Sequence, residues 1–509
     1  MKFSKYFMLA GAAAMLAACS SEEPVPAPGT SDAANVEVNA YVSLAIGLPA
    51  GDATRAFSNV TYDKGTAEEY DVKNAHLVIF KGDTEADAEV SSIYNITGEW
   101  TEAAEGNVTR TLKTNVGITE NPANEKIYAL VVLNDGDAAT HYAAGVKYSD
   151  LIGNAASWIA TNTTNGIYMT NAPMVGGYTL VELSGANIAP DENTPAAATA
   201  QIYVERGVAK VTLSAKASGN SYDVTPKGGE KITGVIQKWD LDITNKTAYP
   251  VRNVTGFANW GNHLKSADRI FWAVDPNYSD AKSTVDGNIF NRYTAALPNA
   301  VGASEYCLEN TMDYLHMNKT QSTRVVLSVK FGNETLYRSN VNGLMYTETE
   351  LKNYIIEVAQ AADKTLEAEK ITVEFPDAAG ADMAIKSVKY DGTDIDGLVA
   401  SLGKFYVWKD GIAYYKAIIK NVADNAYEWN KDVAYTADEL GRWGVVRNNS
   451  YEVVINSINK LGKGTPGELE PKNEPDDQPD PEDEDNDEFA IDFTVNMHSW
   501  AKHVQNEDL

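Results

Sequence analysis

The chain has 509 residues, of which 44% are apolar and 9% aromatic, and this is enough for two or three domains with cores of their own. Its 71 acidic residues outnumber its 42 basic ones, and a formal net charge of -29 repels nucleic acid and anionic lipid surfaces. We therefore expect no nucleic-acid partner.

The N-terminus has the pattern of a bacterial lipoprotein signal. Lys2 and Lys5 precede an apolar stretch at 7–18 that is too short for a stable membrane anchor, and the Leu-Ala-Ala-Cys sequence at 16–19 resembles a lipobox. The pattern predicts cleavage before Cys19, acylation of its thiol, and attachment of the precursor to the outer membrane through lipid. The alternative is a plain secretory signal in which the cysteine is incidental.

A strand with apolar residues at every second position follows the signal. This alternation is typical of a strand with one buried face. A trypsin-like protease could cut between Arg55 and Ala56, shortly after the strand. The strand could thus be removable, although Arg55 could also be an ordinary loop arginine after a permanent strand. The alternating residues are Val36, Val38, Ala40, Val42, Leu44, Ile46 and Leu48.

A second alternating strand ends the chain, beyond a segment rich in Pro, Asp and Glu at 464–488. Such a segment favours an extended tether over packed structure. A strand on a tether can pair with the sheet of another molecule, and we interpret it as a donor strand; the alternative is pairing with the sheet of its own subunit. Its apolar residues are Phe489, Ile491, Phe493, Val495 and Met497.

Between these two strands the sequence predicts mainly β-structure in two sandwich domains, with a few short helices. Short runs rich in β-branched or aromatic residues predict strands at 77–80, 127–133, 209–213, 325–329 and 371–375. The best helix candidate is 349–362, where apolar residues recur at helical spacing, although residues 355–358 could equally form a strand. We expect the following organisation: signal peptide 1–18, propeptide with the removable strand 19–55, N-terminal domain 56–218, C-terminal domain 219–463, tether 464–488 and donor strand 489–509.

No motif in the sequence indicates an enzyme. The six histidines are scattered, and neither a metal-protease, a nucleophile-elbow nor a phosphate-loop motif is present. Cys307 is more typical of a small buried apolar residue than of a nucleophile. We therefore expect no catalytic residue, no metal site and no cofactor.

Several segments together resemble the fimbrilins of Bacteroidales, which form type V pili, and most closely the structural subunit of the short, Mfa-type fimbriae. The resemblance covers the chain from signal to last residue and is most specific at 445–451 and 457–462. The segments that carry it are Tyr203-Val204-Glu205-Arg206-Gly207-Val208-Ala209-Lys210, Ile127 to Asp135, Val445-Val446-Arg447-Asn448-Asn449-Ser450-Tyr451, Ser457-Ile458-Asn459-Lys460-Leu461-Gly462, the acidic tether and the terminal strand.

The resemblance implies two transthyretin-like β-sandwich domains in tandem and a surface fimbrium that supports adhesion and biofilm formation. It implies an Arg-specific protease that cuts after Arg55, loss of the strand at 36–48, and a groove filled by residues 489–497 of the next identical subunit. Accessory anchor and tip proteins are the other implied partners.

The alternative function is that of a monomeric surface lipoprotein, or a tip or anchor adhesin, that binds glycan or host protein. Exposed tryptophans could line a glycan platform, but tryptophans in a β-sandwich are more often core residues. The candidates are Trp260, Trp272, Trp429 and Trp443.

Overall fold

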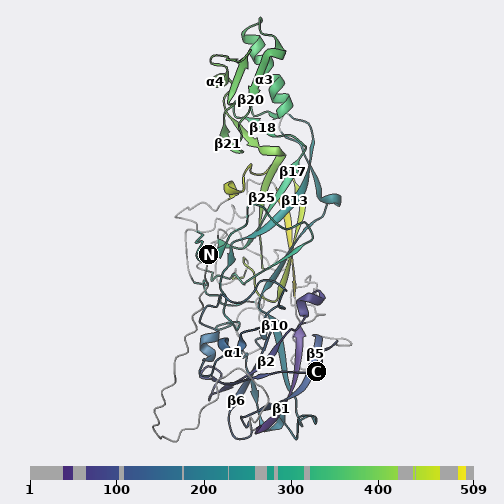
Figure 1. The fold of residues 1–509 in the computed structure, drawn as a ribbon, viewed down its shortest axis with the longest axis vertical. Coiled ribbons are helices and arrows are strands. Elements are labelled where there is room, and N and C mark those ends of the chain that lie inside the picture. Colours follow the sequence, from purple (N-terminus) through teal and green to yellow (C-terminus); the bar gives the residue numbers. More distant parts are fainter. Residues whose placement is uncertain are drawn as a thin grey trace, which may run out of the picture.

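The protein is elongated, with β-sheets following one another along its long axis and α-helices α3 and α4 at one end (Figure 1). The computed structural model describes residues 38–49, 65–102, 108–174, 177–226, 229–257, 272–279, 285–314, 321–421, 440–441, 443–469 and 491–499. Among these residues, no helix is both long enough and apolar enough to cross a bilayer.

The N-terminal part is built on ten strands in the order β3-β2-β6-β7-β10-β1-β5-β4, with β8 on β6 and β9 on β1. Strand β10 joins two halves, because its first residues pair with β1 and its last ones with β7. Their apolar faces enclose one core. The strands are β1 (Ala40–Pro49), β2 (Ala75–Lys81), β3 (Glu89–Asn95), β4 (Thr101–Glu102), β5 (Val108–Ile118), β6 (Ile127–Leu133), β7 (Met169–Asn171), β8 (Val181–Leu183), β9 (Ile188–Ala189) and β10 (Ala200–Arg206).

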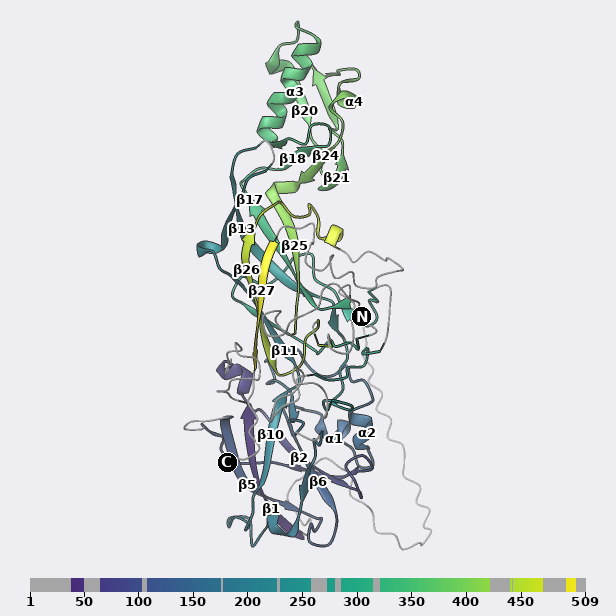
Figure 2. The same ribbon diagram turned by 180° about the vertical axis from the view of Figure 1, so that it is seen from behind.

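Two four-stranded sheets enclose the second core. One sheet has the order β16-β11-β26-β27 and the other the order β12-β13-β17-β25. Figure 2 shows β26 and β27 side by side, with the sheet of β13, β17 and β25 nearby. The strands are β11 (Ala209–Ala215), β12 (Ser221–Val224), β13 (Ile232–Asp242), β16 (Ser304–Cys307), β17 (Arg324–Phe331), β25 (Ile412–Ile418), β26 (Asn449–Ile458) and β27 (Ile491–Ser499), with the short pair β14 (Thr244–Asn245) and β15 (Phe290–Asn291) beside them.

A third core lies at the end that carries α3, and sequence reasoning did not anticipate it as a separate unit. It combines the sheet β19-β18-β24-β21 with the sheet β20-β22-β23 and two helices. Its elements are β18 (Leu336–Ser339), β19 (Met345–Thr347), α3 (Glu348–Ala362), β20 (Ile371–Glu374), β21 (Gly380–Met383), β22 (Ser387–Tyr390), β23 (Thr393–Asp394), α4 (Leu398–Leu402) and β24 (Phe405–Trp408). The short helices α1 (Ala138–His141) and α2 (Tyr148–Leu151) belong to the N-terminal part.

Helix α3 confirms the helix expected at 349–362. It begins after Thr347, whose hydroxyl accepts a hydrogen bond from the backbone N–H of Glu350 at 3.2 Å, while the Glu350 carboxylate accepts one from the N–H of Thr347 at 2.7 Å. This reciprocal capping box satisfies two otherwise unpaired donors. Leu351, Ile355 and Ala359, spaced four apart, bury one face against the third core.

The expectation of a mainly β fold is confirmed, and β2, β6, β11, β17 and β20 all form where short β-branched runs predicted strands. The chain first passes from the first core to the second between Val208 and Ala209, ten residues before the expected domain boundary, and Ala248, Val251 and Leu308 belong again to the first core. The two-domain division remains a proposal.

The packed part of the chain continues beyond the expected start of the tether at residue 464. Residues Pro466–Leu469 form a 3-10 turn, and Leu469 is buried against Leu297 and Val326. Glu468 holds this turn because its Oε2 accepts hydrogen bonds from the backbone N–H of Thr465 at 3.1 Å and from the hydroxyl of Tyr406 at 2.8 Å. Expecting the tether from residue 464 was therefore wrong for 464–469, where one buried leucine and a paired carboxylate outweigh the polar composition.

Candidate functional site

Strand β1 lies in the middle of its sheet and is paired along both edges. It runs antiparallel to β5, from Ala40 opposite Ile118 to Gly47 opposite Thr111, and parallel to β10 from Leu44 opposite Ala200. Strand β9 pairs with its beginning. Removing β1 would therefore leave an open slot between β5 and β10, with unpaired backbone groups along both sides.

Both faces of β1 are largely buried, but they carry different kinds of side chain. Val42, Leu44, Ile46 and Leu48 point into the first core and are fully buried. The opposite face carries Tyr41, which is partly buried, and the buried residues Ser43, Ala45 and Gly47. The Ser43 hydroxyl donates to Oδ1 of Asn115 at 2.6 Å and accepts from the N–H of Ala196 at 2.8 Å, so the loop around 196 covers this face. A replacement strand therefore needs large apolar residues on the face that enters the first core.

Strand β27 lies at the edge of its sheet, antiparallel to β26 of the same chain. Val495 stands opposite Val453 and is 5% exposed, whereas Ile491 and Phe493 are only partly buried. On the other face Asp492, Thr494 and Asn496 are exposed, as the alternation predicts. The structure thus shows the arrangement that we kept as the alternative, in which the terminal strand pairs with its own sheet.

The two strands are held to different degrees. Strand β1 has neighbours on both edges and buries both faces, whereas β27 has a neighbour on one edge and exposes one face. An edge strand with partly exposed apolar side chains gives up fewer contacts on leaving its sheet than an inner one. A donor role for β27 remains a prediction that this difference makes physically accessible.

Several predicted residues lie outside the described part of the chain. They are Cys19, Val36, Arg55, Ala56 and Phe489. Val38 lies two residues before the first residue of β1 and is 43% exposed, so it does not belong to the buried face as expected. Met497 lies within β27, opposite Tyr451 in the backbone register.

Two of the segments that carry the fimbrilin resemblance, 203–210 and 445–451, meet where the two large cores join. The peptide N–H of Asn448 donates to the carbonyl of Val208 at 2.8 Å, and Oδ1 of Asn448 accepts from the N–H of Arg206 at 3.2 Å. Gly207 is required between them, because a Cβ there would come within 2.7 Å of the Tyr168 ring. Two motifs more than 230 residues apart in sequence thus form one joint.

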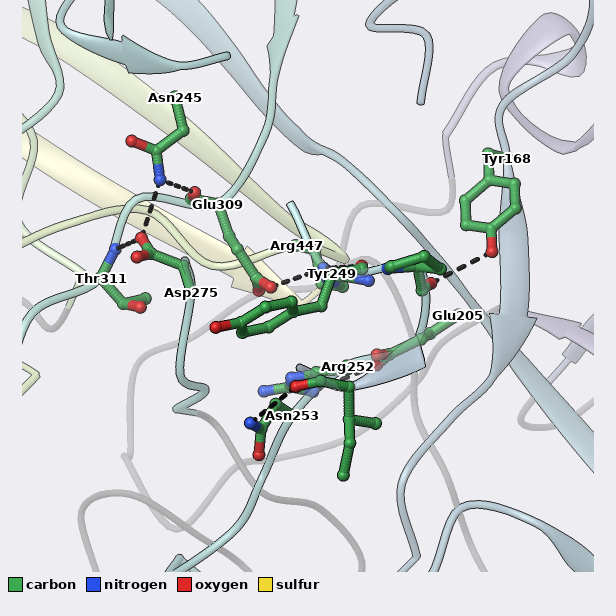
Figure 3. A network of polar contacts seen from close by, with 12 residues as sticks. Tyr168, Glu205, Asn245, Tyr249, Arg252, Asn253, Asp275, Glu309, Thr311 and Arg447 are labelled. Carbon is green, nitrogen blue, oxygen red and sulfur yellow. Dashed lines mark hydrogen bonds and ion pairs between the residues drawn. The ribbon is translucent and has the colours of Figure 1, made fainter. Parts of the chain in front are cut away.

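Buried ion pairs surround this joint (Figure 3). Arg447 donates from Nη2 to Oε1 of Glu309 at 2.6 Å and to the carbonyl of Tyr249 at 2.8 Å. Arg252 donates from Nη1 to Oε2 of Glu205 at 3.1 Å. All four charged side chains are at most 2% exposed. Since a buried charge is tolerated only when paired, each partner fixes the position of the other.

Asp275 lies beside this network, and the pKa of its carboxyl is raised. Its Oδ2 accepts hydrogen bonds from the N–H of Thr311 at 2.6 Å and from Nδ2 of Asn245 at 2.8 Å. Burial raises its pKa to about 7, although these hydrogen bonds favour the charged form. Nothing near Asp275 in the sequence signals this.

A further buried pair joins η1 (Ala67–Tyr70), at the start of the first core, to β11. Nζ of Lys210 lies 2.9 Å from Oε1 of Glu69, which also accepts from the hydroxyl of Tyr306 at 2.7 Å. Sequence reasoning singled out the segment 203–210 and Arg447 but missed their acidic partners Glu69 and Glu309. No pattern could have revealed them, because the partners come from distant turns.

Three of the remaining candidate residues are buried. Cys307 is 2% exposed, and burial raises the pKa of its thiol far above the ordinary range, so it is a core residue. Trp272 and Trp443 are at most 1% exposed and form no platform. Trp260 and Trp429 lie outside the described residues. Within the described part no cluster of His, Cys, Asp or Glu could hold a metal ion.

Comparison with known proteins gives one family. Residues 406–506, which include β25, β26 and β27, match the family described as major fimbrial subunit protein type IV, fimbrillin, C-terminal. A search of curated proteins finds none with significant sequence similarity.

Two solved structures illustrate what the fold is similar to. A fimbrilin from Porphyromonas gingivalis W83 has 16% identity and a TM-score of 0.40, with 92% of this chain and 99% of that chain covered. The C-terminally truncated tip fimbrial protein Mfa3 from Porphyromonas gingivalis has 11% identity and a TM-score of 0.35, with 90% and 100% covered. The predicted resemblance to the fimbrilins is confirmed for residues 406–506, the segment that matches the model of this family.

Proposed function

We propose that this protein is a structural subunit of a cell-surface fimbrium and that it polymerises when β1 is removed by proteolysis and replaced by the terminal strand of another copy. The observation that supports this most directly is the position of β1. It is an inner strand with four fully buried apolar side chains, yet it lies at the N-terminal end of the described part of the chain, before Arg55. Its loss would open a slot in the sheet. All the other described strands would stay in the mature chain, because they follow Arg55 in the sequence.

The energetics are adequate for such an exchange. Four side chains on β1 bury at roughly 1.5–3 kcal/mol each, so the slot without a strand is less stable by about 6–12 kcal/mol and exposes apolar surface. A donor with apolar residues at 489, 491, 493, 495 and 497 offers a matching face. Because donor and slot lie on different parts of the subunit, the contact is head-to-tail and generates a filament.

The proposal includes the export and processing of the precursor. The precursor is a lipoprotein acylated at Cys19 that reaches the outer membrane surface, and an Arg-specific, trypsin-like protease cuts between Arg55 and Ala56. Limited proteolysis of the precursor should give a fragment that begins with Ala56. Anchor and tip proteins would complete the fimbrium, which would support adhesion and biofilm formation.

Two complementary variants test the exchange. Arg55→Ala keeps β1 in place, so that subunit can donate but not accept. A processed chain without residues 489–509 can accept but not donate. Neither should polymerise alone, and their mixture should give a dimer and nothing larger, measured by size-exclusion chromatography with light scattering.

The matched control adds Phe493→Asp to the donor, which should abolish the dimer. If the mixture stays monomeric although both variants are folded, strand exchange through residues 489–509 is ruled out.

A second candidate function is that of a tip or anchor component. The pairing of β27 with β26 of the same chain favours it, because a subunit that keeps its terminal strand cannot donate it. In that case no copy of this chain would donate its terminal strand, and the mixture of the two variants would stay monomeric.

A further inference from the structure

A pocket of about 550 Å³ opens between the second and third cores, and no residue of β1 or β27 lines it. Its walls come from the end of β12, the turn between β18 and β19, strand β24 and residues 459–463. This volume lies in the range of sites that hold small ligands.

The charge of the pocket is opposite to that of the protein. Arg338, Lys460 and Lys463 line it, and no Asp or Glu is among its lining residues. In a chain with 71 acidic and 42 basic residues, three cations around one cavity without an acidic side chain create a local positive potential. Such a pocket attracts an anion.

Arg338 is held in place by aromatic rings rather than by an acid. Its guanidinium carbon lies 5.4 Å from the centre of the Tyr406 ring and 5.7 Å from that of Trp408. The side chain is exposed, and within the described part of the chain it has neither an ion pair nor a side-chain hydrogen bond. Stacking on ring faces leaves its N–H groups available for a ligand.

The two rings are themselves fixed by hydrogen bonds. The Tyr406 hydroxyl donates to Glu468 at 2.8 Å and accepts from the N–H of Gly464 at 2.8 Å. Nε1 of Trp408 donates to the carbonyl of Gly462 at 2.8 Å. The guanidinium is therefore preorganised by groups whose own polar atoms are satisfied, and a planar fork of this kind matches a carboxylate.

We propose that this pocket binds a carboxylate-bearing saccharide of one or two rings, with the carboxylate on Arg338. Lys460 lies at the same opening and adds charge, Asn459 and Thr225 offer neutral groups to hydroxyls, and Met345 offers an apolar surface. A long acidic peptide fits less well, because it would need cations spread along a groove, whereas here they surround one cavity.

The test is a titration of the purified full-length chain by ligand-observed NMR, with digalacturonate as the acidic probe and a neutral digalactoside of the same size as the reference. We expect the acidic probe to bind at least about tenfold more tightly than the neutral one. Added salt should weaken the binding of the acidic probe. Arg338→Gln should weaken binding of the acidic probe about tenfold to a hundredfold, and Arg338→Lys less, since lysine keeps the charge but not the fork.

The matched control is Lys364→Gln, which makes the same charge change at an exposed turn after α3 and should leave binding unchanged. Thermal unfolding of each variant verifies its fold. Equal affinity for acidic and neutral probes, or unchanged binding in Arg338→Gln, overturns the proposal. A peptide with the sequence of residues 480–488 that binds more tightly than digalacturonate also overturns it and assigns the pocket to acidic peptides.

Discussion

Arg447 and Glu309 form an ion pair of 2.6 Å in which neither side chain is more than 1% exposed. The arginine lies in the most specific motif of the resemblance, just before β26, and the glutamate just after β16. Together with the contact between Asn448 and Arg206, the pair fixes the first core on the second.

Removing one partner of this pair should be costly. Arg447→Met leaves Glu309 buried without its cation, and we expect the free energy of unfolding to fall by about 3–5 kcal/mol. Urea unfolding followed by tryptophan fluorescence measures it. Adding Glu309→Gln to this variant should restore part of the loss, because the uncompensated charge is gone; an additive or larger loss in the double variant would contradict the pairing.

A cavity-creating substitution in β1 should destabilise the precursor but not the processed subunit. Leu44 is fully buried, so Leu44→Ala should lower the stability of the precursor by about 2–5 kcal/mol. After processing the residue is no longer present, and fibres from the variant should unfold at the same denaturant concentration as wild-type fibres. If these fibres are destabilised as well, β1 stays in the mature subunit.

The two faces of β27 should respond differently to a charge. Phe493 is partly buried opposite Ile455, and Phe493→Asp places a carboxylate on an apolar face, at a cost of several kcal/mol. Thr494 is exposed on the other face, so Thr494→Asp is the matched control and should be tolerated in the monomer. Electron microscopy of cells carrying each variant should show fibres only for Thr494→Asp; equal fibre numbers would mean that the apolar face docks into nothing.

Glu305 should make the stability depend on pH. Burial, and then the nearby charge of Asp240, raise its pKa to about 7, above the ordinary 4.5. The folded protein therefore holds this proton more firmly than the unfolded chain, so the stabilisation is complete below about pH 4.5 and is lost as the pH rises through 7.

Glu305→Gln removes this titration. Between pH 5 and 8 the wild-type protein should lose on the order of 1–3 kcal/mol more stability than the variant, by urea unfolding at each pH. Glu357→Gln, at an exposed position on α3, is the control and should follow the wild-type curve. Parallel curves for Glu305→Gln and wild type would show that the carboxyl is charged throughout.

Local patterns predicted much of the secondary structure. Alternation placed β1 and β27, the β-branched run at 127–133 became β6, and helical spacing with a capping threonine produced α3. These elements depend on neighbours within a few residues, which the sequence displays directly. The start of the tether was misplaced because the packing of Leu469 depends on Leu297 and Val326, which are far away in the chain.

The sequence by itself determined the mainly β fold, the two alternating strands, the acid excess and the resemblance confirmed over 406–506. Only the tertiary structure decided which groups meet: that β1 lies between β5 and β10, that β27 pairs with β26, that Glu309 faces Arg447, and that Arg338 stacks on Tyr406 beside a cavity. The physical reason is that alternation and composition specify which face of a strand is buried. Strand pairing and buried ion pairs join residues from distant segments, and no local pattern predicts which of these residues come into contact.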